Sequence, residues 1–323
     1  MAAAAAAPGP ELVTRARAAL LGLVVGAELG TAPEEAAGVG TVGVGPDAQG
    51  TVPQGEGNSA LRLDGLPPAP AMALHLAESL AEHGELDVPD VTARWVRWMR
   101  AGGPGMGSTT RRALELLERG TEPFEAGRLA RDADPHRSAG NGALTRCIPV
   151  ALRYHDHLEK LIRVCAQQAA ITHGDERCTW GAAALGLAVR ELLQGNRHFV
   201  DEVRHRLADR APRTLLEAIS RVPWEEEGAL PIAVAGETGY VVHCVEVAFW
   251  CAVHAPSLEA ALVLLTTAGG DTVTNAAVAG ALLGTRDGET AIPGPWRDRI
   301  RDATGVAELA ERLVRYDFLT RST

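Results

Sequence analysis

Apolar residues recur at spacings of three and four along nearly the whole chain. The first such segment covers residues 11–29 and ends at Gly30. This spacing places apolar side chains on one face of an α-helix. It predicts further helices over residues 71–83, 88–100, 108–119, 123–132, 143–155, 158–171, 176–193, 197–209, 240–253, 258–268, 272–283, 296–302 and 306–318. The pattern therefore predicts an all-α protein, a compact bundle of many helices.

Two internal stretches lack this periodicity. Residues 31–70 are rich in Gly and Pro, and a loop of that length is usually functional or disordered. Residues 222–238 resemble a linker, and their best strand candidate, 230–234, contains a proline that argues against a strand. The low-complexity residues 1–10 predict a disordered tail. We therefore expect a single domain over residues 11–320, interrupted by a long loop at 31–70.

Composition narrows the class of protein. Hydrophobic residues make up 46% of the chain and aromatic residues 4%, which predicts a core of Ala, Leu and Val. The net charge of −10 argues against a nucleic-acid partner, and no apolar run is long enough to predict a membrane span. Five cysteines without a Cys-x-x-Cys pair favour a reducing compartment. We expect a soluble cytoplasmic protein, with oligomerisation left open.

The segment from Gly269 to Thr274 carries the clearest chemical signal. Gly269 and Gly270 end one predicted helix, and Asp271 begins an apolar one. Asp271 and Thr274 are three residues apart, so both point toward the start of that helix. In one interpretation Asp271 caps the helix by accepting from the amide of Thr274. In the other, Asp271 and Thr274 are oxygen ligands of a hard cation.

Several short motifs, taken in order, resemble those of the ADP-ribosylglycohydrolase family over nearly the whole chain. The segment at 269–274 is similar to the family's Gly-Gly-Asp-x-Asp-Thr turn, with Val273 at the second Asp. The first helix resembles the family's opening helix, with Ala27 at its usual Asp. The other matches are Gly105–Arg111, Gly140–Arg146 with Pro149, Thr172–Asp175, and Ile292-Pro293 with Trp296.

The resemblance implies a weakened metal site. Members of the family use magnesium ions to hydrolyse ADP-ribosyl or related glycosidic bonds, and a second metal motif reads Thr-Asp-Asp-Thr. Here those four positions are Pro67-Pro68-Ala69-Pro70. A two-metal site needs several shared carboxylates, whereas only Asp271 and Thr274 remain, unless Glu28, Glu56 or Asp64 substitutes. We expect no cofactor, or at most one weakly bound Mg²⁺.

The resemblance implies that the ligand-binding residues are better retained. Gly140, Asn141 and Gly142 precede a predicted helix, where backbone amides favour an anion, although they could serve only as a helix cap. By resemblance this loop faces the phosphates of ADP-ribose. His173 is either a pocket residue or a buried packing residue. Family position also places Gly239, Tyr240, Gly269 and Gly270 at the pocket.

Three functions stay open at this point. The leading hypothesis is a family member that lacks ordinary metal-dependent hydrolase activity and retains a pocket for a small ligand of the ADP-ribose or nucleotide type. The second is an enzyme, either with a residual ADP-ribosyl hydrolase activity or with altered chemistry, for example in specialised metabolism, that uses Asp271 as a general acid or base without metal. The third is a structural or assembly protein.

Overall fold

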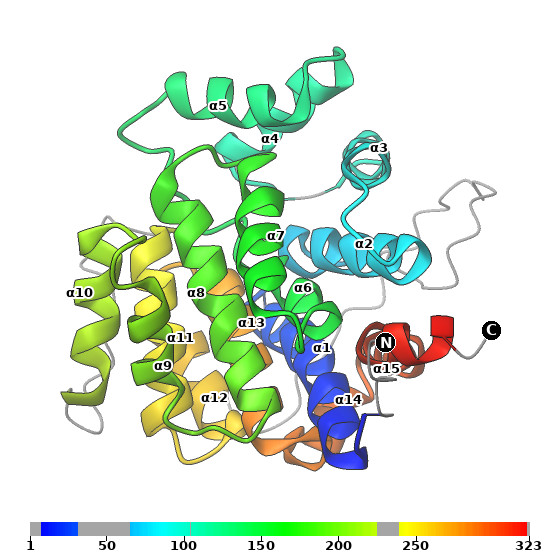
Figure 1. The fold of residues 1–323 in the computed structure, drawn as a ribbon, viewed down its shortest axis with the longest axis vertical. Helices are drawn as coiled ribbons and strands as arrows, with labels where there is room; N and C mark the ends of the chain where they lie inside the picture. Colours follow the sequence, from blue (N-terminus) through cyan, green and yellow to red (C-terminus); the bar gives the residue numbers. More distant parts are fainter. Residues whose placement is uncertain (1–7, 32–64, 104, 225–238, 322–323) are drawn as a thin grey trace.

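A computed structural model describes residues 8–31, 65–103, 105–224 and 239–321 of the chain, with the side chains of 317–321 left out. The predicted all-α class is confirmed, because no strand occurs in these residues (Figure 1). The α-helices are α1 Pro10–Thr31, α2 Pro68–His83, α3 Val88–Arg100, α4 Ser108–Glu118, α5 Pro123–Asp132, α6 Cys147–Arg153, α7 Leu158–Ala170, α8 Glu176–Leu193, α9 Phe199–Leu207, α10 Arg213–Arg221, α11 Val241–His254, α12 Leu258–Ala268, α13 Thr272–Asp287, α14 Gly294–Arg297 and α15 Ala303–Arg321. Two 3₁₀ turns, Val222–Trp224 and Glu289–Ala291, complete the described elements.

The centre of the molecule is an antiparallel pair formed by the first helix and one of the last, α1 and α13 (Figure 1). Their contact is a row of small residues at every fourth position on each helix. A Cβ atom added to Gly26 would lie 2.0 Å from the carbonyl oxygen of Ala276, and one added to Gly280 would lie 2.3 Å from that of Gly22. The two backbones therefore touch, which only glycine allows at these positions.

The helices around this pair complete the core. α8 and α11 are apolar on most of their circumference, as buried helices are, and both pack on α13. Most buried side chains are Ala, Leu or Val, as the composition predicts. All five cysteines are buried and free. No helix in the described part of the chain is both long and apolar enough to cross a membrane.

Several predicted boundaries were wrong. The helix predicted over 143–155 is only α6, because residues 143–146 form turns in which the amide of Leu144 donates to the carbonyl of Asn141. The helix predicted over 296–302 is the four-residue α14, and α13 runs on to Asp287. The nine-residue α10 was missed, because its buried stripe of Leu215, Ala218 and Ile219 is too short to stand out from its charged neighbours.

The predicted loop at 31–70 is shorter at both ends. Thr31 closes α1, and residues 68–70 form the first turn of α2. Proline suits this turn, since its fixed φ matches the helix and its missing N–H is not needed there. The interior of the loop, most of the predicted N-terminal tail and the strand candidate at 230–234 lie outside the described residues.

Candidate functional site

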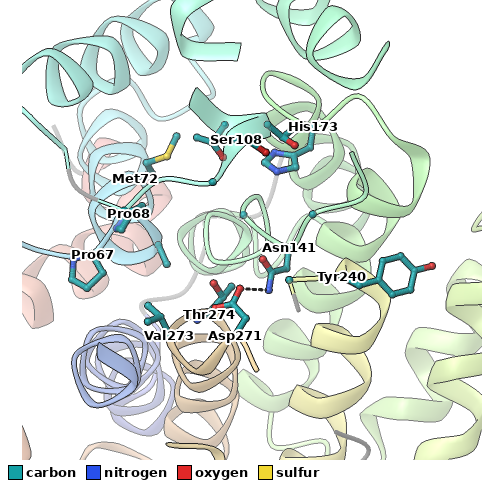
Figure 2. Close-up of a pocket in the computed structure, with 18 of the residues that line it drawn as sticks. Pro67, Pro68, Met72, Ser108, Asn141, His173, Tyr240, Asp271, Val273 and Thr274 are labelled. Atoms are coloured by element: carbon teal, nitrogen blue, oxygen red, sulfur yellow. Dashed lines mark hydrogen bonds between the residues drawn. The ribbon is translucent and has the colours of Figure 1, made fainter. Parts of the chain in front are cut away.

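A cavity of about 1070 Å³ opens where the N-terminal ends of α2, α4 and α13 approach one another. The loop before α6, the turn after α7 and the start of α11 close its other sides (Figure 2). A volume of this order accommodates a ligand of nucleotide size. Segments far apart in the sequence thus converge on one pocket, and these include most of the motifs recognised above.

Asp271 lies at the floor of this cavity with both carboxylate oxygens engaged. Oδ1 accepts from the backbone amide of Thr274 at 3.1 Å, which confirms that Asp271 caps α13. Oδ2 accepts from Nδ2 of Asn141 at 2.9 Å, the bond drawn in Figure 2. Val273 and Thr274 also line the cavity. The carboxylate therefore joins the start of α13 to the glycine loop at 140–142.

The loop Gly140–Gly142 is fastened to the segment before α11. The amide of Asn141 donates to the carbonyl of Gly239 at 2.8 Å, and the amide of Val241 donates to that of Ala139 at 3.0 Å. The loop does not run directly into a helix as predicted, because turns separate it from α6. All three loop residues nevertheless line the cavity, so they can contact a ligand through backbone groups and through Asn141.

His173 forms the wall opposite Asp271, next to Ser108 (Figure 2). Its side chain is nearly fully buried, and its Nδ1 lies 2.7 Å from the hydroxyl oxygen of Thr172. Burial, together with the nearby positive charge of Arg146, lowers the pKa of His173 to about 3. The imidazole is therefore neutral at physiological pH.

The other predicted pocket residues differ in position. Gly239 and Tyr240 line the cavity, but the Tyr240 ring points away from its centre (Figure 2). Gly269 and Gly270 are not among the lining residues. Their φ angles of 81° and 78° reverse the chain between α12 and α13, and so they position Asp271 without facing the cavity.

Several residues for which no role was predicted also line the cavity. Thr109 and Thr110 belong to the Gly105–Arg111 match, so the motif itself could have indicated them. Arg137 and Met72 had no comparable signal. Glu56 and Asp64, named as substitute metal ligands, lie outside the described residues, whereas Glu28 lines the cavity.

Glu28 is expected to make stability depend on pH. Burial raises its pKa from 4.5 to about 7, and attraction to Arg299 opposes part of this rise. Between these two values the folded state holds a proton that the unfolded state has released, so stability falls as pH rises through this window. We expect Glu28→Gln to be more stable than the parent by about 1 to 2 kcal/mol at pH 8, after allowance for solvent screening.

Urea unfolding of parent and Glu28→Gln at pH 8 and pH 4 would measure the difference. At pH 4 the Glu28 carboxyl is mostly protonated in both the folded and the unfolded state, so the two curves should nearly coincide. Equal stability at pH 8 as well would show that Glu28 is fully solvated.

Comparison with known proteins shows the family to which the chain is similar. A sequence model of the ADP-ribosylglycohydrolase family matches residues 8–322. The chain is 28% identical over 319 residues to an ADP-ribosylarginine hydrolase, Tri1, of Serratia proteamaculans, covering 95% of this chain and 80% of that protein. It is also 28% identical to the ADP-ribosyl-(dinitrogen reductase) glycohydrolase of Rhodospirillum rubrum, covering 90% and 92%.

Solved structures include the same fold. An ADP-ribosylglycohydrolase-related protein complex superposes with a TM-score of 0.72 at 29% identity, covering 95% of this chain and 99% of that one. The sequence match runs from α1 to α15 and therefore includes the described segments that line the cavity. The chain therefore belongs to the ADP-ribosylglycohydrolase family.

Proposed function

We propose that this protein binds a ligand of the ADP-ribose type in the cavity described above, without a pair of magnesium ions and without ordinary magnesium-dependent ADP-ribosyl hydrolase activity. The observation that carries the proposal is the composition of the cavity wall around Asp271. There the side chains of Pro67, Pro68 and Val273 carry no oxygen atom, whereas the family motifs have Thr and Asp at these positions.

The available oxygen atoms do not fit two magnesium ions. Each ion takes about six oxygens in nearly octahedral geometry, and a two-metal site shares several carboxylates. Among the described residues that line the cavity, only Glu28 and Asp271 carry a carboxylate, and the Asp271 oxygens already accept two hydrogen bonds. Within the same described ranges, three close metal-ligating side chains occur only at Glu82, His83 and Asp90, none of which lines this cavity.

The parts of the cavity that would hold a ligand support binding. The Gly140–Gly142 loop is tied on one side to Gly239, and Asn141 is oriented by Asp271. Relatives over most of the chain are named as hydrolases of ADP-ribosyl groups, which favours ADP-ribose as the ligand.

Calorimetric titration of ADP-ribose into the protein, with magnesium and again with a chelator, tests the proposal. We expect binding in both buffers with dissociation constants within about threefold, since about 0.65 kcal/mol corresponds to that ratio. A release assay on ADP-ribosylated arginine should show no magnesium-dependent turnover, with the Serratia relative as positive control. Binding that needs magnesium, or turnover that the chelator abolishes, would contradict the proposal.

A further inference from the structure

Arg146 is a buried cation directly beneath the cavity wall. Its side chain is fully buried, and within the described part of the chain no carboxylate pairs with it. Its guanidinium lies 4.5 Å from the centroid of the Trp95 ring and donates from Nε to Gln168 at 3.0 Å. Burial lowers its pKa to about 9, which leaves it charged at neutral pH. Burying a charge without a counter-ion costs desolvation free energy, so the presence of Arg146 here indicates a specific role.

The guanidinium is linked to the cavity through two side chains. Nη2 of Arg146 donates to the Thr172 hydroxyl oxygen at 2.6 Å, and the same oxygen lies 2.7 Å from Nδ1 of His173. An arginine can only donate, so Thr172 accepts at this bond. The Thr172 hydroxyl proton then has one partner within the described residues, the Nδ1 nitrogen of His173. A hydroxyl proton aimed at Nδ1 requires that nitrogen to be unprotonated.

The other ring nitrogen of His173 faces the cavity. A Cβ atom built on Gly140 or Gly142 would have Nε2 as a near neighbour, at 3.5 Å and 3.4 Å respectively, so Nε2 is on the ring edge directed at the glycine loop. No hydrogen-bond partner for Nε2 occurs in the residues that the structure describes. A neutral imidazole that accepts at Nδ1 carries its proton on Nε2.

We propose that Arg146, acting through Thr172, holds His173 as the Nε2–H tautomer, so that this wall presents an N–H donor that selects an anionic oxygen of the ligand. The donor lies beside the Gly140–Gly142 loop, and the buried cation behind it polarises the chain of hydrogen bonds toward the cavity. An anion bound there also supplies part of the missing counter-charge. That the anion is a phosphate of ADP-ribose rests on the proposed function, whereas the tautomer does not.

Nuclear magnetic resonance of protein labelled with ¹⁵N-histidine, without ligand, tests the tautomer. The His173 signals are assigned by their loss in His173→Gln. We expect a neutral ring with the proton on Nε2 in the parent and in Thr172→Ser, which keeps the hydroxyl. Thr172→Val should shift the population toward Nδ1–H. A proton on Nδ1 in the parent would overturn the proposal, and so would an unchanged tautomer in Thr172→Val.

Calorimetry tests the role in recognition. Loss of one oriented donor to a charged oxygen should weaken ADP-ribose binding by Thr172→Val about tenfold, while Thr172→Ser stays within about threefold. Adenosine, which has no phosphate, should bind parent and both variants equally. Unchanged ADP-ribose affinity in a folded Thr172→Val would overturn this role. If the parent binds no ADP-ribose, the proposed function fails, but the resonance experiment still tests the tautomer of His173.

Thermal melting shows whether each variant is folded. If Thr172→Val is unfolded, the tautomer of His173 in the parent protein is the test of the proposal.

Discussion

Replacing Gly26 with alanine is expected to lower the free energy of unfolding by about 3 kcal/mol or more, a large part of the stability of an ordinary domain. The added Cβ would lie 2.0 Å from the carbonyl oxygen and 2.5 Å from the carbonyl carbon of Ala276. Both are backbone atoms within a helix, so they cannot rotate away as a flexible side chain would. α1 and α13 would have to separate, which weakens contacts along their whole interface.

The matched control is Gly294→Ala. Gly294 is also helical, but a Cβ added there meets nothing within 4 Å, so its stability should change by less than about 0.5 kcal/mol. Urea unfolding followed by circular dichroism measures both variants. A loss below about 1 kcal/mol for Gly26→Ala would mean that the two helices can move apart at little cost, contrary to the close contact described.

Replacing Gly142 with leucine is expected to abolish ADP-ribose binding, with a loss of affinity of at least about 100-fold, or roughly 2.7 kcal/mol. A Cβ at this position lies 3.2 Å from both Cε1 of His173 and the hydroxyl oxygen of Thr110. The rest of the side chain would occupy the space in front of the glycine loop. Gly142 lines the cavity and has no positive φ, so the fold itself should tolerate the change.

Two alanine variants distinguish steric exclusion of the ligand from the effect of merely removing a glycine from the cavity wall. Gly107 lines the same cavity, but a Cβ added there meets nothing within 4 Å. Gly142→Ala should weaken ADP-ribose binding about tenfold, and Gly107→Ala by less than about threefold. Calorimetry with parallel melting curves gives both numbers. Undiminished binding by a folded Gly142→Leu would place the ligand outside this cavity.

Helix type and most helix positions could be predicted from the sequence, because the buried stripes of long helices repeat over several turns. The ends of α3, α5, α8 and α12 agree with the predicted ranges for this reason. The prediction failed where the element is short, as in α10, or where turns carry apolar residues, as at 143–146. In those places the packing of the whole molecule, and not the local pattern, determines the conformation.

The candidate site was predictable only in part. Its motif residues could be named from resemblance, and the cap at Asp271 was one of the two interpretations of its spacing to Thr274. The chain of hydrogen bonds from Arg146 through Thr172 to His173 could not be predicted, because it depends on the side-chain rotamers of residues on neighbouring segments. Nor could the sequence show that Gly269 and Gly270 do not line the cavity, because the resemblance names a motif and not the direction in which each of its residues faces.

The pairing of α1 with α13 has a consequence for how the site comes into being. The hydroxyl of Thr272 donates to the carbonyl of Gly30 at 2.8 Å, across a separation of 242 residues. A contact between such distant positions closes a long loop of chain, and proteins rich in such contacts fold more slowly than those with local contacts. On the ribosome, α1 is synthesised more than 200 residues before its partner α13. A chain that ends before the N-cap of α13 therefore lacks Asp271, Val273 and Thr274, and with them the floor of the cavity.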